Sequence, residues 1–225
     1  MAEEAPLPTR DPKTVLSSIL SLTETRIVPL TARGVTSGSK LFGAAILSSS
    51  TLSPYTVSTN DERTSPLLHG EINCIQHFFT KDYPDPSTRP DPRRDCVFFA
   101  THEPCSLCLS GIAWSGFREV YYLFTYEDSR DLFAIPHDIN ILQEVFRVRA
   151  EGEDEGALGR RALYNRTNGF FTARSLGDLV DEIPGEEERA YWRGEMERVK
   201  GLYNALSDTY QEGKKAGAES SSVWK

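Results

Sequence analysis

Apolar segments of strand length alternate with helical patterns between residues 41 and 125. The most apolar segment, Cys96–Thr101, carries no charge and predicts a buried strand. Strands that alternate with helices pack in layers, because each element has an apolar side to bury. The sequence therefore predicts a layered α/β domain. The expected strands are residues 41–47, 55–60, 96–101 and 120–125, and the expected helices are residues 69–81 and 106–115.

One helix and two loops are predicted around these segments. Asp11 is a good N-cap and Pro12 suits the first helical position, so a helix is expected to begin at residue 12. Pro29 is expected to end or kink this helix, because proline has no backbone N–H and its ring is bulky. Residues 31–40 are rich in Thr, Ser and Gly and predict a loop. Residues 82–95 contain four prolines and predict a second loop.

The chain after residue 125 has weaker patterns. A helix is expected over residues 140–148, and residues 151–156 are polar and expected to be exposed. One charged surface helix is expected over residues 186–215, followed by a disordered tail over the last ten residues. The predicted organisation is a flexible leader over residues 1–10, a main domain over 11–150 and a C-terminal extension over 151–225.

The charge balance limits the kinds of partner. The 225 residues include 33 acidic and 25 basic side chains, which gives a net charge of −8. Proteins that bind duplex nucleic acid present an excess of Lys and Arg, so a nucleic-acid partner is not expected. Arg89, Arg93 and Arg94 lie close together in sequence, but such a cluster is most simply a solvated face.

The sequence has no feature of a membrane or secreted protein. No apolar run approaches the roughly 20 residues that span a bilayer. The acidic, proline-rich start lacks the pattern of a signal peptide. A cytoplasmic location is therefore expected, with the nucleus as the alternative. The four cysteines are not expected to form disulfides in such a compartment.

Two short motifs contain residues that bind metals. The first is His69-Gly70-Glu71 and the second is Pro104-Cys105-Ser106-Leu107-Cys108. Each motif alone is weak, but one imidazole and two thiolates form a zinc site that leaves a fourth position for water. Both motifs lie at expected helix starts, where partial positive charge favours thiolates. Together they predict a catalytic zinc site with Glu71 beside it, although Glu71 could also be an exposed residue of a first helical turn.

These motifs resemble those of a known family. The pattern H-x-E followed by P-C-x-x-C is the signature of zinc nucleobase deaminases. Residues 101–122, THEPCSLCLSGIAWSGFREVYY, are similar to the guanine deaminase and tRNA adenosine deaminase branch of the cytidine deaminase-like superfamily. Residues 42–46 resemble the first strand of that branch, and the resemblance extends over residues 12–147. It implies a three-layer α/β/α sandwich with a mixed central sheet of about five strands, here with a C-terminal helical extension.

The resemblance also implies roles for individual residues. The ligands would bind Zn²⁺, the glutamate would carry protons between water, ring nitrogen and leaving amine, and zinc-bound hydroxide would attack the ring. Asn60 could instead be a turn residue, and Asp138 could instead cap a helix. The expected site consists of His69, Cys105 and Cys108 for zinc, Glu71 for proton transfer, and Asn60, Asp138, Phe42 and His102 for the substrate.

Other residues near the motifs have simpler expected roles. Cys74 and Cys96 fall in apolar segments and are expected in the core. Glu103 is expected to brace the loop before the cysteine pair. Trp114 is expected in the core or in a pocket wall. The family more often has alanine where this chain has Gly70, a difference that is expected to matter little.

Three functions remain open on the sequence. The favoured one is a zinc-dependent hydrolase of nucleobase metabolism that deaminates a nucleobase, a nucleoside or a related small amino-heterocycle. The alternatives are a tRNA adenosine deaminase subunit and a non-catalytic binding module with the same fold. Deaminases of this kind often associate, so the resemblance also implies a homodimer. Residues 150–225 have no counterpart in the family and no predicted role.

Overall fold

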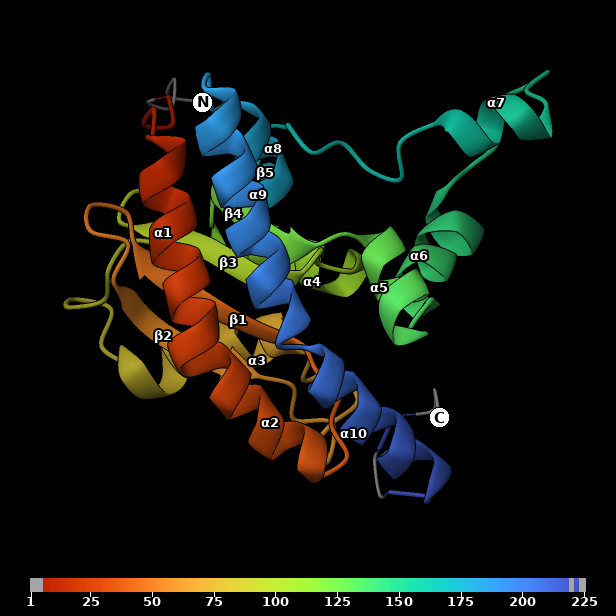
Figure 1. Ribbon diagram of the computed structural model, residues 1–225, viewed down its shortest axis with the longest axis horizontal. Helices are drawn as coiled ribbons and strands as arrows, with labels where there is room; N and C mark the ends of the chain where they lie inside the picture. Colours follow the sequence, from red (N-terminus) through yellow and green to blue (C-terminus); the bar gives the residue numbers. More distant parts are fainter. Residues whose placement is uncertain (1–5, 219–220, 223–225) are drawn as a thin grey trace.

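A mixed sheet of five strands forms the centre of the part of the chain that the computed structural model describes, residues 6–218 and 221–222 (Figure 1). The strand order is β2-β1-β3-β4-β5. β1 pairs antiparallel with β2 and with β3, whereas β3, β4 and β5 are parallel. The strands are β1 (Gly43–Ser48), β2 (Pro54–Thr59), β3 (Cys96–His102), β4 (Glu119–Phe124) and β5 (Thr172–Ser175).

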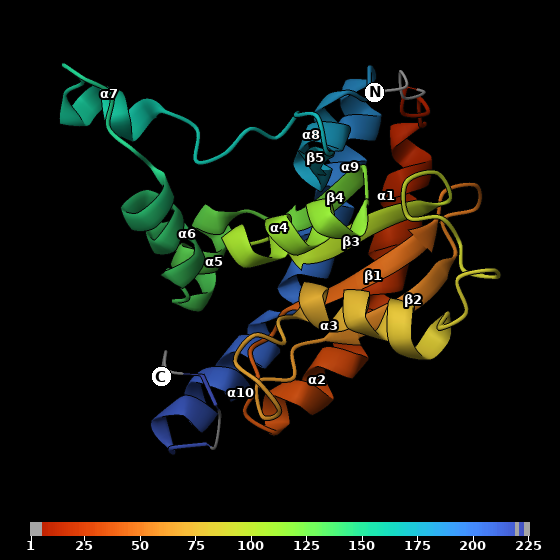
Figure 2. The ribbon, with the colours of Figure 1, turned by 180° about the vertical axis from the view of Figure 1, so that it is seen from behind.

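Helices cover both faces of the sheet, as Figures 1 and 2 show from opposite sides. α3 (Gly70–His77) and α4 (Ser106–Ser115) lie on one face. α1 (Pro12–Leu22), α8 (Leu176–Asp181) and α9 (Glu186–Gly201) lie on the other. All residues of β1, β3 and β4 are buried, as expected of strands covered on two sides. The predicted three-layer α/β fold with a mixed sheet is therefore confirmed.

The N-terminal helix begins as predicted and continues further than predicted. Asp11 caps α1 by accepting a hydrogen bond from the backbone N–H of Thr14 at 3.0 Å. A π-helical turn, Thr23–Ile27, then leads into α2 (Val28–Thr36), and Pro29 lies in the first turn of α2. Proline needs no hydrogen-bond partner there, so the predicted end at Pro29 is wrong. The loop predicted over 31–40 is limited to the residues after Thr36.

The charged helix predicted over residues 186–215 is two helices. α9 ends at Gly201 and α10 (Asn204–Lys215) follows after a short break. Tyr203, in the break, is fully buried, and Met196 and Val199 of α9 also face the core. This segment is therefore part of the layer that covers the sheet, with its charged side chains on the outer side.

The sequence patterns missed four elements after residue 125. Capping boxes at Thr125 and Ser175 start α5 and α8, and each box pairs a hydroxyl with an aspartate three residues later. β5 is only four residues long, which leaves little periodicity to detect. The helix expected over 140–148 is present as a helical segment over residues 137–146. That segment consists of α6 (His137–Ile141) and the π-helical turn Leu142–Phe146, and the four missed elements are α5 (Tyr126–Phe133), α7 (Glu155–Arg160), β5 and α8.

Residues 147–171 form an arm that carries α7 away from the sheet and returns to β5 (Figure 1). The predicted leader falls partly outside the described residues, and Arg10 at its end forms an ion pair with Glu119 at 2.6 Å. The predicted disordered tail also lies partly outside the described residues, and Ser221 within it donates its backbone N–H to the carbonyl of Glu62 at 3.0 Å. Among the described residues, no helix has the length and apolar character required to cross a bilayer.

Candidate active site

The three predicted metal ligands lie together at the starts of two helices. His69 is the N-cap residue of α3 and Cys105 is the N-cap residue of α4, with Cys108 one turn further along α4. His69 Nδ1 lies 3.5 Å from Cys105 Sγ and 3.7 Å from Cys108 Sγ. All three ligand atoms lie within 4.8 Å of one another. The structure therefore brings together two motifs that are 36 residues apart in the chain.

The electrostatics of the cluster favour a cation. Hydrogen bonds from Cys108 and His69 lower the pKa of the Cys105 thiol well below its usual value. Burial opposes protonation of His69, but the hydrogen bond and the negative charge of Cys105 outweigh it and raise its pKa to about 9. The N-termini of α3 and α4 also direct partial positive charge at the sulfurs. A thiolate is thus stable at this position.

The donor set fits zinc. One imidazole nitrogen and two sulfurs are ligands that Zn²⁺ prefers, and within the described residues the cluster holds no fourth histidine, cysteine or carboxylate ligand. Three protein ligands with one open position are typical of catalytic zinc sites, whereas structural sites have four protein ligands. Cys74 and Cys96 lie in the core, as predicted, and take no part in the cluster.

Glu71 is buried beside the ligands. Its side chain is only 4% exposed, so the alternative of an exposed first-turn glutamate is wrong. Its Oε2 atom has no hydrogen-bond partner in the protein. Burial, followed by the negative charge of Cys105, raises the pKa of Glu71 to about 7. A carboxyl group with this pKa can both accept and release a proton near neutral pH.

Asn60 links the end of β2 to the start of α3. Its Oδ1 accepts a hydrogen bond from the backbone N–H of Gly70 at 2.6 Å, while its buried Nδ2 has no partner. The backbone carbonyl of Phe42 accepts the N–H of Asn60 at 3.1 Å. Asn60 therefore has a structural contact on one atom and a free donor on the other.

Gly70 is required by a close backbone approach. A Cβ atom at this position would lie 2.9 Å from the carbonyl oxygen of Phe42 and 3.0 Å from the Cα atom of Gly43. Neither backbone atom can move without shifting β1. The expectation that glycine in place of alanine matters little is therefore wrong for this chain.

Asp138 lies in the first turn of α6, where Pro136 is the N-cap residue, so Asp138 does not cap the helix. It is buried, and burial together with the negative charge of Cys105 raises its pKa to about 8. Its electrostatic interaction with His69 and Glu71 places it near the ligands. Its predicted contact with a substrate remains a prediction.

His102 lies in an aromatic cluster at the end of β3. Its ring packs 4.2 Å from the ring of Phe42 and 4.7 Å from that of Phe124, with Phe133 and Tyr203 at its edges. His102 Nε2 is buried without a partner. Both predicted roles, a substrate contact from His102 and one from Phe42, remain predictions.

Trp114 lies outside the core, because it is 91% exposed, and it lines an open surface pocket together with residues of the 82–95 loop, so only the core expectation is wrong. Trp114 occupies the outer side of α4, where a periodic pattern alone does not distinguish the covered side of a helix from the open one.

The sequence patterns also missed two groups of residues close to the site. Lys40 and Glu62 form a buried ion pair, and Glu62 Oε2 also accepts the backbone N–H of Lys40 at 2.7 Å. Tyr164 and Arg166 of the arm contact Glu103, just before the cysteine pair. Neither group belongs to a short motif, because the partners lie 22 to 63 residues apart, so no local signal could have found them.

The fold and the site define a class of protein: an α/β domain in which one histidine and two cysteines at two helix starts could hold a metal ion. Residues 25–124 match the family model described as the cytidine and deoxycytidylate deaminase zinc-binding region. The matched segment contains all three ligands, Glu71 and Asn60. This segment is therefore similar to the zinc-binding region of cytidine and deoxycytidylate deaminases, as its motifs predicted.

A search of curated proteins gave no match. Among solved structures, guanine deaminase from Bacillus subtilis is 26% identical, with a TM-score of 0.46, over 58% of this chain and 78% of that chain. Guanine deaminase from Nitrosomonas europaea is 16% identical, with a TM-score of 0.42, over 87% of this chain and 98% of that chain. A structure from a study of tRNA:A34 deaminases is 21% identical, with a TM-score of 0.31, over 38% of this chain and 57% of that chain.

Proposed function

We propose that this protein is a zinc-dependent hydrolase that removes an amino group, as ammonia, from a nucleobase, a nucleoside or a related small amino-heterocycle. The observation that carries the proposal is the position of Glu71. Its buried carboxyl group lies beside three metal-ligand atoms, and one of its oxygens has no partner in the protein. A buried polar atom without a partner is costly, and a reacting group would give it one.

The residues of the site support a hydrolytic deamination. Zinc held by His69, Cys105 and Cys108 would act as a Lewis acid and lower the pKa of water to about 7. Glu71 takes a proton from the attacking water and delivers protons to the ring nitrogen and to the leaving amine. A C–O bond forms at the ring carbon, its C–N bond breaks and ammonia leaves.

Two further residues are proposed to bind the substrate. Asn60 donates a hydrogen bond from Nδ2 to a ring or carbonyl acceptor, since its Oδ1 is occupied by Gly70. Asp138, which interacts electrostatically with the ligand cluster, contacts the amino group. Both residues orient the ring so that its amino-bearing carbon faces Glu71.

The buried Glu71 also distinguishes this proposal from a non-catalytic module, because a structural zinc site needs no such carboxyl group. The net charge of −8 favours a small molecule over RNA as the partner. We further propose a cytoplasmic homodimer. Light scattering of the purified protein tests the dimer, and a gel shift with tRNA at low and moderate salt tests the RNA alternative.

The central experiment is a screen of purines, pyrimidines and pterins, free and as nucleosides, for ammonia release by zinc-loaded protein. Glu71→Gln, which removes the titratable group and keeps the size, should bind zinc and lose at least a hundredfold in kcat. Loaded protein that releases ammonia from no compound would support the binding module instead. Equal turnover by Glu71→Gln would exclude Glu71 as the proton carrier.

A further inference from the structure

Two residues connect β3 to the metal site, and hydrogen bonds to the backbone of each residue hold this connection in place. Glu103 and Pro104 lie between His102, the last residue of β3, and the ligand Cys105. The backbone N–H of Glu103 donates to the carbonyl of Phe124 at 2.8 Å, and the hydroxyl of Tyr126 donates to the carbonyl of Pro104. The position of Cys105 therefore depends on how firmly this connection is held.

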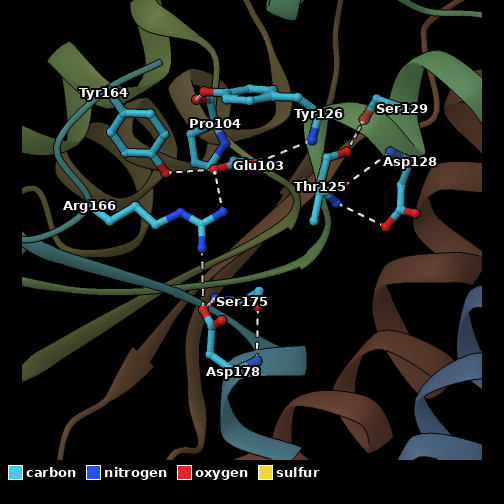
Figure 3. A network of polar contacts seen from close by, with 10 residues as sticks. All are labelled: Glu103, Pro104, Thr125, Tyr126, Asp128, Ser129, Tyr164, Arg166, Ser175 and Asp178. Carbon is cyan, nitrogen blue, oxygen red and sulfur yellow. Dashed lines mark hydrogen bonds and ion pairs between the residues drawn. The ribbon is translucent and has the colours of Figure 1, made fainter. Parts of the chain in front are cut away.

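The carboxylate of Glu103 is the centre of a polar network, which Figure 3 shows. Its side chain is only 2% exposed. It accepts the hydroxyl of Tyr164 at 2.8 Å and the backbone N–H of Tyr126 at 3.2 Å, and Arg166 lies 3.7 Å away. Two of these three groups come from the arm, which is outside the segment matched by the deaminase family.

Arg166 also connects the network to the C-terminal extension. Its second guanidinium nitrogen lies 3.6 Å from the carboxylate of Asp178, which is part of the capping box of α8. The guanidinium group lies over the ring of Tyr122, 5.5 Å from its centre. Arg166 thus lies between the Glu103–Pro104 connection and α8, which packs on the opposite face of the sheet (Figure 3).

We infer that Tyr164 and Arg166 are positioning residues of the metal centre, which act on Cys105 through Glu103. A buried carboxylate that loses the Tyr164 and Arg166 contacts must turn toward other partners such as the hydroxyl of Tyr122, and this turn shifts the adjacent Pro104 and Cys105. The C-terminal extension therefore holds the zinc site in its binding geometry. This inference rests on the proposed function only in requiring that the cluster binds zinc.

The coupling is reciprocal. If the arm contacts favour zinc binding, zinc binding must favour the arm contacts by the same free energy. Residues 161–171 should therefore exchange their amide hydrogens more slowly in zinc-loaded protein than in zinc-free protein. A purely structural role of the arm would leave its exchange independent of zinc.

The test measures zinc affinity by competition with a chromogenic chelator, in full-length protein. Tyr164→Phe and Arg166→Gln should each weaken zinc binding by up to about tenfold, the lower end of the effect of losing a group that contacts a metal ligand directly, because both residues act through Glu103. Arg166→Lys keeps the charge and should restore part of the affinity. Arg174→Gln is the matched control, because Arg174 lies in the same extension but pairs with Glu182 at 2.6 Å.

The outcomes separate this inference from the proposed function. Thermal unfolding measures the stability that each variant loses. Arg174→Gln should also lose stability, but its zinc affinity should stay at the wild-type value. Wild-type protein that binds zinc, with Tyr164→Phe and Arg166→Gln binding it equally well, overturns this inference alone. Wild-type protein that binds no zinc overturns both.

Discussion

The side-chain Oδ1 of Asn60 accepts the backbone N–H of Gly70 at 2.6 Å, so the residue after β2 caps the helix that begins beside the ligand His69. His69 makes no capping hydrogen bond with its own side chain. Its imidazole is therefore free to bind a metal, because a residue from another element satisfies a helix N–H group. The arrangement separates the capping role from the ligand role.

Asn60→Ala is expected to destabilise the protein and to weaken zinc binding. It removes the acceptor of a buried N–H, which costs about 1–3 kcal/mol. Chemical denaturation measures the stability and chelator competition measures the zinc affinity. Asn204→Ala, at an exposed position with no side-chain hydrogen bond, is the control and should change neither value. Unchanged stability in Asn60→Ala would show that water replaces the lost acceptor.

Gly70→Ala and Gly194→Ala should have opposite effects. The first places a Cβ atom 2.9 Å from a backbone oxygen of Phe42 and should cost about 1–3 kcal/mol, with a loss of zinc affinity. The second lies in α9 with no atom within 4 Å of its Cβ and should stabilise the protein by up to about 1 kcal/mol. Thermal unfolding of both variants checks the pair. A stable, zinc-binding Gly70→Ala would mean that β1 and α3 separate easily.

Lys40→Met should be strongly destabilising. It leaves the buried carboxylate of Glu62 without its ion-pair partner, which costs about 3–5 kcal/mol. The double variant Lys40→Met/Glu62→Gln removes the charge, keeps an acceptor for the Lys40 backbone N–H and should recover most of the loss. Lys13→Met breaks an exposed pair with Glu188 and should cost about 0–1 kcal/mol. Urea titrations of the three variants measure these differences.

The buried imidazole of His102 should make the protein less stable in mild acid. Burial, together with the charge of Lys200, lowers its pKa well below the ordinary 6.5. Below about pH 6.5 the unfolded chain binds a proton at this histidine and the folded chain does not, so acid favours unfolding. Above that pH both states are neutral and the effect vanishes.

His102→Phe tests this assignment, since a phenyl ring suits the aromatic cluster and does not titrate. The free energy of unfolding should fall less between pH 7.5 and 5.5 in the variant than in the wild type. All other titrating groups are common to both chains, so the difference isolates His102. Identical pH profiles would show that the imidazole of His102 takes up its proton equally in the folded and unfolded protein.

The metal ligands could be predicted from the sequence because they belong to short motifs at helix starts. His69 and Cys105 lie at the starts of helices, where both motifs were expected, Cys108 lies in the first turn of α4, and Glu71 follows two residues after His69. Most strands were also predicted, because β1 and β3 are continuous apolar runs. Local chemistry and local burial determine these features.

Features that depend on tertiary contacts could not be predicted in this way. Pro29 was expected to end or kink a helix, but the chain continues past it as α2 after a π-helical turn. The polar partners of Glu103 lie 61 and 63 residues away, in a segment without a motif. The exposure of Trp114 could not be predicted either. Nothing in the neighbouring sequence shows that its side of α4 is left uncovered.

The position of β5 also has a consequence during synthesis. β4 ends at residue 124 and its parallel neighbour begins at residue 172, so a ribosome must add 47 residues before the outer side of β4 can be paired. At roughly 5–20 residues per second, this leaves an open strand edge for several seconds on each nascent chain. Chaperones that shield extended segments would act on the protein in this interval, before the last strand arrives.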